Sequence, residues 1–97
     1  MFVRVGTFRL KPGTLDEFRE TYYSTCSPIV KAASGSVDCM VLEPTDEQDP
    51  VAVCTVWQTE ADAVAYEASG AAADVVSRVR AFFAGPPELH SYRIQQP

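Results

Sequence analysis

Hydrophobic and polar residues alternate along some segments of this chain and recur at helical spacing along others. Four segments alternate with period two and therefore predict β-strands: residues 2–10, 36–43, 51–58 and 89–95. Three segments place apolar residues at steps of three and four and therefore predict helices: residues 14–33, 60–69 and 71–83. The breaks between these segments are rich in glycine, proline and acidic residues, which are typical of turns.

The predicted strand over residues 51–58 is apolar on both faces, which is typical of a central strand that is covered on both sides. Thr59 follows the strand, and its hydroxyl is placed to cap the next helix by accepting a hydrogen bond from the amide of Asp62. That helix ends at Gly70. Trp57 therefore lies at the mouth of a central strand, just before a helix that returns over the sheet, and this geometry can form a pocket.

The first predicted helix carries one long apolar stripe: Leu15, Phe18, Tyr22, Cys26, Ile29 and Ala33. Thr14 is placed to cap its start, and Gly35 is placed to end it in a left-handed conformation. Pro28 interrupts the stripe because proline lacks an amide donor and clashes with the preceding turn. Either a kink or a restart of the helix capped by Ser27 would accommodate it.

The order strand, helix, strand, strand, split helix, strand predicts a single domain over residues 1–97. We expect an α+β, ferredoxin-like βαββαβ sandwich with a four-stranded antiparallel sheet and helices on one face. The other face would carry a broad apolar set: Val3, Val5, Met40, Leu42, Cys54, Val56, Tyr92 and Ile94. A soluble monomer rarely exposes so much contiguous apolar surface. The pattern therefore predicts a homodimer that packs sheet on sheet.

Charge and composition narrow the range of partners. The net charge of −5 argues against nucleic acid, because phosphate binding needs a basic surface. No apolar run approaches the ~20 residues of a membrane span, and the chain enters a strand directly rather than a signal peptide. We therefore expect a cytoplasmic protein without a membrane partner. The three cysteines form no Cys-x-x-Cys pair and are interpreted as small buried apolar residues, with no disulfide or metal site expected.

Three stretches together resemble a known family: FRLKPG at residues 8–13, VWQTEADAVAY at residues 56–66 and HSYRI at residues 90–94. They are similar to the antibiotic biosynthesis monooxygenase domain, and the resemblance extends over nearly the whole chain. It implies a dimeric α+β barrel. The activities it implies are varied, because the family includes cofactor-free oxygenases of polyketide quinols, haem-degrading enzymes, quinol monooxygenases and a sugar-phosphate isomerase.

The departures from the family pattern are informative. Haem-degrading members carry an asparagine on the first strand, a tryptophan on the helix after the strand tryptophan and a haem-ligating histidine further on. Those positions read Gly6, Tyr66 and Val76 in this chain, so no iron ligand remains and no cofactor or metal is expected. Many other members place a histidine where this chain has Tyr66. A phenol at that position still donates a hydrogen bond.

The candidate substrate-binding residues predict a largely apolar pocket between the helices and the sheet. We expect Trp57, Tyr66, Tyr22 and Phe8 to border it, and Gly6 to leave space beside them. A pocket with aromatic walls suits a small planar aromatic substrate. Trp57 either stacks on such a ring or plugs the end of the core. Tyr66 is the first candidate for a catalytic hydrogen bond to a ring oxygen.

The remaining candidates are charged or titratable. His90 is the only histidine and is either a base near neutral pH or a structural residue. Arg78 either contacts a ring oxygen or, like Arg80, is a solvated helix charge. Arg4 lies on a strand face that otherwise carries apolar side chains. Pairing of Arg4 with a carboxylate such as Glu43 is favoured there over binding of an anionic ligand.

Three classes of function follow. The first is a cofactor-independent monooxygenase that uses dioxygen on a phenolic or quinol-like aromatic. The second is a non-oxidative isomerase or cyclase in the same pocket, for which a proton-transfer group is indispensable. The third is a non-catalytic dimer that binds a small molecule. Oxygen uptake separates the first class from the other two.

Overall fold

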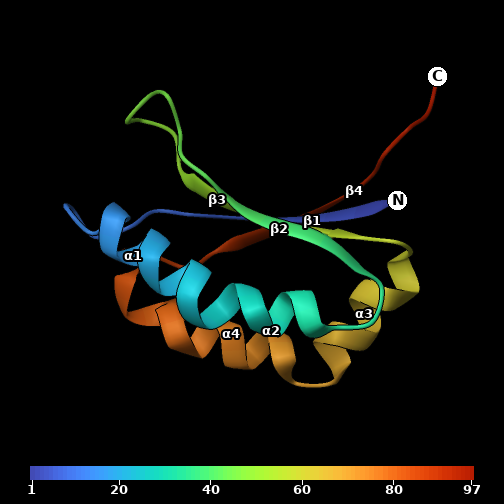
Figure 1. Ribbon diagram of the computed structural model, residues 1–97. Coiled ribbons are helices and arrows are strands. Elements are labelled where there is room, and N and C mark those ends of the chain that lie inside the picture. Colours follow the sequence, from blue (N-terminus) through green and yellow to red (C-terminus); the bar gives the residue numbers. More distant parts are fainter.

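In the computed structural model, which describes residues 1–97, helices cover one face of a four-stranded antiparallel sheet (Figure 1). The strands are β1 (Phe2–Phe8), β2 (Ser36–Leu42), β3 (Val51–Trp57) and β4 (Glu88–Arg93). The helical elements are α1 (Leu15–Thr21), the π-helical segment η1 (Tyr22–Cys26), α2 (Ser27–Ala32), α3 (Glu60–Ala68), α4 (Ala71–Val79) and the 3₁₀ turn η2 (Arg80–Phe82). The strand order is β2-β3-β1-β4. The predicted ferredoxin-like α+β fold is confirmed.

The register of the sheet decides which side chains face the helices. β1 and β3 are the two central strands, as predicted for β3. Gly6 of β1 lies opposite Val53 on β3 and Leu89 on β4. Directly opposed residues share a face of an antiparallel sheet. The inward face of the sheet therefore carries β1 side chains at even positions and β3 side chains at odd positions.

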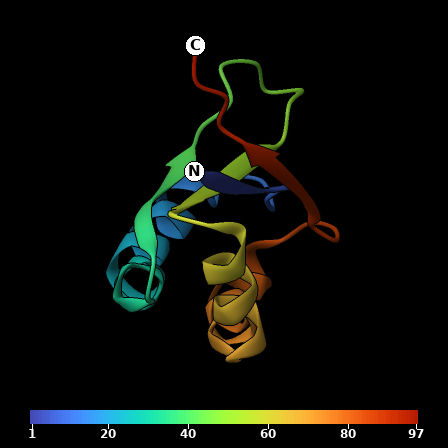
Figure 2. The same cartoon turned by 90° about the vertical axis from the view of Figure 1, so that its right-hand side faces the viewer.

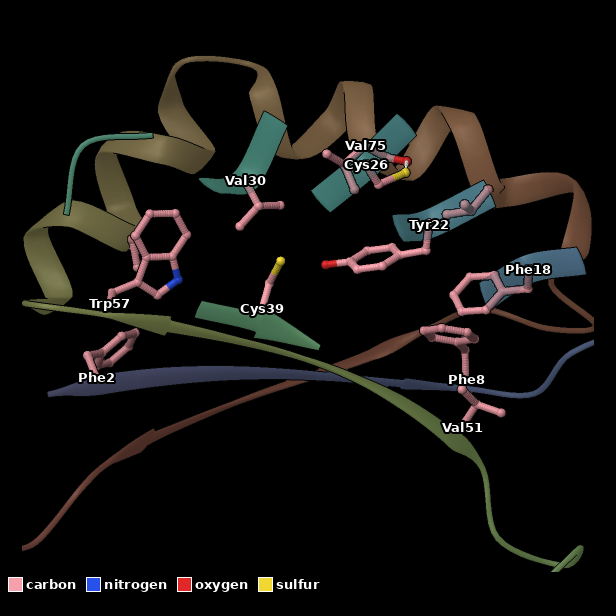
Figure 3. Close-up of a cluster of buried hydrophobic side chains, with 12 residues drawn as sticks. Phe2, Phe8, Phe18, Tyr22, Cys26, Val30, Cys39, Val51, Trp57 and Val75 are labelled. Atoms are coloured by element: carbon pink, nitrogen blue, oxygen red, sulfur yellow. Dashed lines mark hydrogen bonds between the residues drawn. The ribbon is translucent and has the colours of Figure 1, made fainter. Parts of the chain in front are cut away.

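The core lies between this inward face and the helices (Figure 3). Its largest fully buried side chains are Trp57, Tyr22, Phe18, Val30 and Cys26. The thiol of Cys26 donates a weak hydrogen bond to the carbonyl of Val75, with a sulfur–oxygen distance of 3.6 Å, and so joins η1 to α4.

A π-helical turn accommodates Pro28 within a continuous helix. The amide of Ser27 donates to the carbonyl of Tyr22, five residues back, and the Ser27 hydroxyl donates to the carbonyl of Tyr23. The helix is thus widened before the proline rather than restarted by a Ser27 cap. Apolar residues four apart drift by about 40° per step around an α-helix. The wider turn corrects this drift, and Phe18, Tyr22, Cys26 and Val30 are all buried.

The structure tests the predictions made for three helix ends. Thr59 caps α3 as predicted, because its hydroxyl accepts a hydrogen bond from the amide of Asp62 at 3.2 Å. The predicted side-chain cap at Thr14 is wrong, since that hydroxyl donates to the carbonyl of Lys11 instead. Gly35 adopts the expected left-handed conformation, with φ of 80°.

The second face of the sheet has no covering element, because all the helices lie on the other side of the sheet (Figure 2). Several apolar side chains of this face are exposed, among them Leu42, Tyr92 and Ile94 at 45%, 57% and 41%. The loop between β2 and β3 and the C-terminal segment both project on this side (Figures 1 and 2). No helix of the protein has both the length and the apolar character needed to cross a membrane.

Candidate active site

A cavity of about 270 Å³ lies between the helices and the inward face of the sheet. Of its 19 lining residues, 13 are hydrophobic, so a ligand inside it would be held mainly by apolar contact. The wall consists of Arg4, Gly6, Phe8, Phe18, Tyr22, Val30, Val53, Thr55, Trp57, Tyr66, Glu67, Ala72, Val75, Val76, Val79, Phe83, Pro87, Glu88 and Leu89. Leu89 of the edge strand β4 is 61% exposed, so this side of the cavity is open to solvent.

The structure brings together all five residues proposed as the aromatic pocket. Phe8 and Gly6 contribute from β1, Tyr22 from η1, Trp57 from β3 and Tyr66 from α3. A Cβ atom added at Gly6 would meet no atom within 4 Å. The glycine therefore leaves open space in the floor of the cavity.

Trp57 closes one end of the cavity. Its side chain has no exposed surface, and its indole Nε1 donates a hydrogen bond to Thr55 Oγ1 at 2.9 Å. The indole packs against Tyr66 with a centroid distance of 4.9 Å and an interplanar angle of 38°. The indole thus both lines the cavity and seals its end. Because the indole has no exposed surface, a ligand would touch the ring only after a neighbouring side chain shifted.

The two tyrosines of the cavity are phenols throughout the physiological pH range. Burial is the main cause that raises the pKa of Tyr66 to about 12. Burial, with a smaller contribution from the neighbouring Cys39 thiol, also raises the pKa of Tyr22 well above its ordinary value. The Tyr22 hydroxyl points toward Cys39 (Figure 3), but the contact does not meet the geometry of a hydrogen bond. Both groups can donate a proton in a hydrogen bond, and neither can serve as a base.

A polar row crosses the inward face of the sheet within this apolar cavity. Arg4 lies opposite Thr55 on β3 and Ser91 on β4, and its guanidinium donates to the Ser91 hydroxyl. Arg4 Nε lies 2.8 Å from Glu67 Oε1. The guanidinium carbon also lies 5.1 Å from the centroid of the Phe2 ring, within the range of a cation–π contact.

The expectation that Arg4 pairs with a carboxylate is correct, but the partner is Glu67 rather than Glu43. Sequence reasoning missed Glu67. It follows Ala63 by four positions on α3, so both fall on one side of the helix, and Ala63 is buried. That spacing is the signal that could have placed Glu67 toward the sheet.

Two proposed catalytic residues lie outside the cavity. His90 lies opposite Val5, on the uncovered face of the sheet, and its Nε2 is 3.6 Å from Glu88 Oε2. Arg78 pairs with Asp74 on the surface of α4, with 3.3 Å between Nε and Oδ1. The structure therefore does not bring either residue to the same cavity as Tyr66.

The cavity wall contains no histidine, cysteine or methionine, and burial raises the pKa of its two tyrosines, which disfavours the phenolate form that ligates haem iron. No cluster of three or more histidine, cysteine, aspartate or glutamate side chains is arranged to hold a metal ion. All three cysteines are free thiols.

The sequence profile of one family, described as antibiotic biosynthesis monooxygenase, matches residues 1–78. The chain belongs to this antibiotic biosynthesis monooxygenase family. Solved structures of the family share its fold at low sequence identity. A monooxygenase from the gene ActVA-Orf6 of Streptomyces coelicolor, in complex with nanaomycin D, is 20% identical, with a TM-score of 0.82 over 99% of this chain and 88% of that chain.

Two further structures show how varied the proteins with this fold are. SnoaB of Streptomyces nogalater, a cofactor-independent oxygenase, is 17% identical, with a TM-score of 0.79 over 99% of this chain and 94% of that chain. MhuD, solved as a point mutant with two manganese protoporphyrin IX bound per active site, is 19% identical, with a TM-score of 0.78 over 100% of this chain and 97% of that chain. Among curated protein sequences, none matches this chain. Similarity at this level establishes the fold and leaves the reaction to the site.

Proposed function

We propose that this member of the family is a cofactor-independent monooxygenase that acts with dioxygen on a small phenolic or quinol-like aromatic. The observation that carries the proposal is the cavity itself, which is walled by apolar and aromatic side chains and contains two protonated phenols. The family assignment supports an oxygenase. SnoaB, of similar fold, is a cofactor-independent oxygenase, and the ActVA-Orf6 monooxygenase binds nanaomycin D.

The chemistry requires little from the protein beyond a suitable environment. An electron-rich aromatic anion can itself react with dioxygen, so the protein must exclude water, hold the ring and stabilise developing negative charge. The apolar wall holds the ring, and an aromatic substrate that fills the cavity displaces water from it. Tyr66 serves the third by donating its hydroxyl to a ring oxygen, since its raised pKa keeps the phenol protonated.

We also propose that the working unit is a homodimer that packs through the uncovered face of the sheet. The support is the group of exposed apolar side chains on that face, which includes Leu42, Tyr92 and Ile94. Removing such a surface from water favours association through the hydrophobic effect. The cavity lies on the opposite side of the sheet, so each subunit would keep its own.

An oxygen electrode tests the proposed reaction. Purified protein is incubated with a panel of quinols and polycyclic phenols that includes 1,4-dihydroxynaphthalene, with spontaneous oxidation subtracted. Oxygen uptake above that background, with incorporation of labelled oxygen into the product, is the expected result. Conversion of an aromatic substrate without oxygen uptake would instead identify an isomerase or cyclase. Binding without any conversion would identify a small-molecule-binding dimer.

A further inference from the structure

An ion pair lies in the wall of the otherwise apolar cavity. Arg4 comes from β1 and Glu67 from α3, and Arg4 Nε and Glu67 Oε1 are 2.8 Å apart. Their side chains are 21% and 39% exposed. An ion pair that is partly removed from water contributes little to stability, because the loss of hydration offsets the attraction between the charges. Stability therefore does not explain why this ion pair lies in the cavity wall, and we look for a role in ligand binding instead.

The guanidinium of Arg4 is held in place but is not fully satisfied. The hydroxyl of Ser91 and the ring of Phe2 fix its position. Its Nε is buried, and although the Glu67 carboxylate is close, the N–H does not point at an acceptor with hydrogen-bond geometry. A buried donor without an aligned acceptor lowers the stability of the folded protein, because it has lost its hydrogen bonds to water. The open space above Gly6, two residues along the same face of β1, gives room for another acceptor close by.

We propose that Glu67 and Arg4 bind the hydroxyl group of a phenolic substrate and take its proton. The O–H bond breaks, the proton moves to the Glu67 carboxylate, and the electron pair remains on the substrate oxygen as a phenolate. Arg4 then pairs with this phenolate in place of the neutralised carboxyl. The step exchanges one anion for another, so the apolar cavity gains no net charge. This inference rests on the proposed function and supplies the base that it lacks.

No other group in the cavity can take that proton. Tyr22 and Tyr66 are protonated phenols. Glu88 lies opposite Thr7 on β1, so its carboxylate, like the nearby His90 side chain, is on the uncovered face of the sheet rather than in the cavity. Besides Glu67, the charged or titratable side chains that face the cavity are Arg4 of β1, Tyr22 of η1 and Tyr66 of α3 itself, and Asp74 of α4 acts on Tyr66.

A second ion pair supplies a matched control. Arg93 of β4 and Glu60 of α3 also join a strand to α3, with 3.0 Å between Nη2 and Oε1. Neither residue lines the cavity. The variants Glu67→Gln and Glu60→Gln therefore each neutralise one carboxylate on the same helix, and only the first alters the cavity.

The first experiment measures binding without turnover. Dissociation constants of 2-naphthol and naphthalene, which differ by one hydroxyl, are measured by calorimetry or NMR titration for the wild type and both variants. We expect the preference for 2-naphthol to fall about 5–10-fold in Glu67→Gln, because a neutral amide is a weaker acceptor than a carboxylate. Naphthalene should bind all three proteins equally. Glu60→Gln should match the wild type, and equal melting temperatures would show that Glu67→Gln remains folded.

The second experiment measures oxygen uptake with 1,4-dihydroxynaphthalene against pH. Loss of a general base should lower the rate of Glu67→Gln at neutral pH by about 10²–10⁴-fold. The rate of that variant should rise as the pH approaches the pKa of the quinol, because a substrate that is already ionised needs no base. Glu60→Gln should keep the wild-type profile.

The outcomes separate this inference from the proposed function. An unchanged preference for 2-naphthol in Glu67→Gln, or an equal loss in Glu60→Gln, overturns the inference. A selective loss in Glu67→Gln without oxygen uptake by the wild type supports Glu67 as the hydroxyl acceptor and contradicts the oxygenase. If the wild type binds neither probe, both proposals fail.

Discussion

Tyr66 packs on the buried indole of Trp57 and lines the cavity, where we propose that its hydroxyl donates to a bound substrate. We predict that Tyr66→Phe lowers turnover roughly 10–1,000-fold with little change in substrate binding, as expected for one donor lost at a developing oxyanion. Oxygen-uptake kinetics and a separate binding titration measure the two effects. Tyr23→Phe is the control, because the Tyr23 hydroxyl accepts a hydrogen bond from the amide of Val41 outside the cavity. Unchanged turnover in Tyr66→Phe would remove it from the mechanism.

Tyr22 makes stability depend on pH in the alkaline range. Its pKa is raised by burial in the folded protein, whereas in the unfolded chain it ionises near its ordinary value of about 10. Above that pH the unfolded chain has released a proton that the folded protein retains, so the free energy of unfolding falls as the pH rises. Tyr66 contributes in the same direction up to about pH 12. Urea unfolding between about pH 8 and 11 should show a shallower decline for Tyr22→Phe, and parallel curves would contradict this account.

At the scale of elements, Gly35 lies between α2 and β2 and is close to Asp62 near the start of α3. It has φ of 80°, and a Cβ atom added there would lie 2.6 Å from the Cβ of Asp62. The amide of Asp62 in turn donates a hydrogen bond to the Thr59 hydroxyl that caps the start of α3. We predict that Gly35→Ala destabilises the protein by about 2–5 kcal/mol, the sum of left-handed strain and steric overlap.

Gly13→Ala separates these two contributions. Gly13 has φ of 77°, but an added Cβ would meet nothing within 4 Å. This variant should lose only about 1–2 kcal/mol. Both values come from urea unfolding of the two variants beside the wild type. An equal loss in the two would show that Asp62 moves aside without cost.

Local patterns predicted the elements, and contacts between distant residues limited the prediction. The alternation of β3 and the cap at Thr59 depend on neighbouring residues, so the sequence was sufficient for both. Thr14 has the same residue type at an equivalent position, but the turn before it offers the Lys11 carbonyl, and its hydroxyl donates there. At Pro28 the sequence predicts either a kink or a restart capped by Ser27, and the π-helical turn before it was not predicted.

The site was predicted in its apolar part and missed in its polar part. The aromatic wall follows from which residues face inward on each element, and periodicity gives that directly. The pairing of Arg4 with Glu67 joins residues 63 positions apart on a strand and a helix. The chain has 13 acidic residues, and the spacing from Ala63 turns Glu67 toward the sheet without selecting it as the partner of Arg4. Likewise, the distance of His90 from the cavity follows from the register of β4 against β1.

At the scale of the whole molecule, the uncovered sheet face is the surface through which we propose that the homodimer forms. Val56 lies on this face of β3, opposite Val3 on β1. We predict that Val56→Asp abolishes dimerisation, or folding with it, because the dimer would bury an unpaired carboxylate. Analytical ultracentrifugation and circular dichroism measure the two possibilities.

Val64→Asp is the matched control for this prediction. Val64 is also exposed, at 49%, but it lies on α3, away from the sheet face. That variant should remain a folded dimer. A wild type that sediments as a stable monomer at high concentration would contradict the proposed assembly.

The chain contains a single tryptophan, Trp57, and it seals the end of the cavity. All indole fluorescence therefore originates at the candidate site. The buried ring, shielded from water and hydrogen-bonded to Thr55, should emit at short wavelength in the free protein. A ligand that displaces Tyr66 and brings a carbonyl or phenolic oxygen to the indole would quench this emission or shift it to longer wavelength. The protein thus contains its own optical reporter, and candidate substrates can be screened without any label.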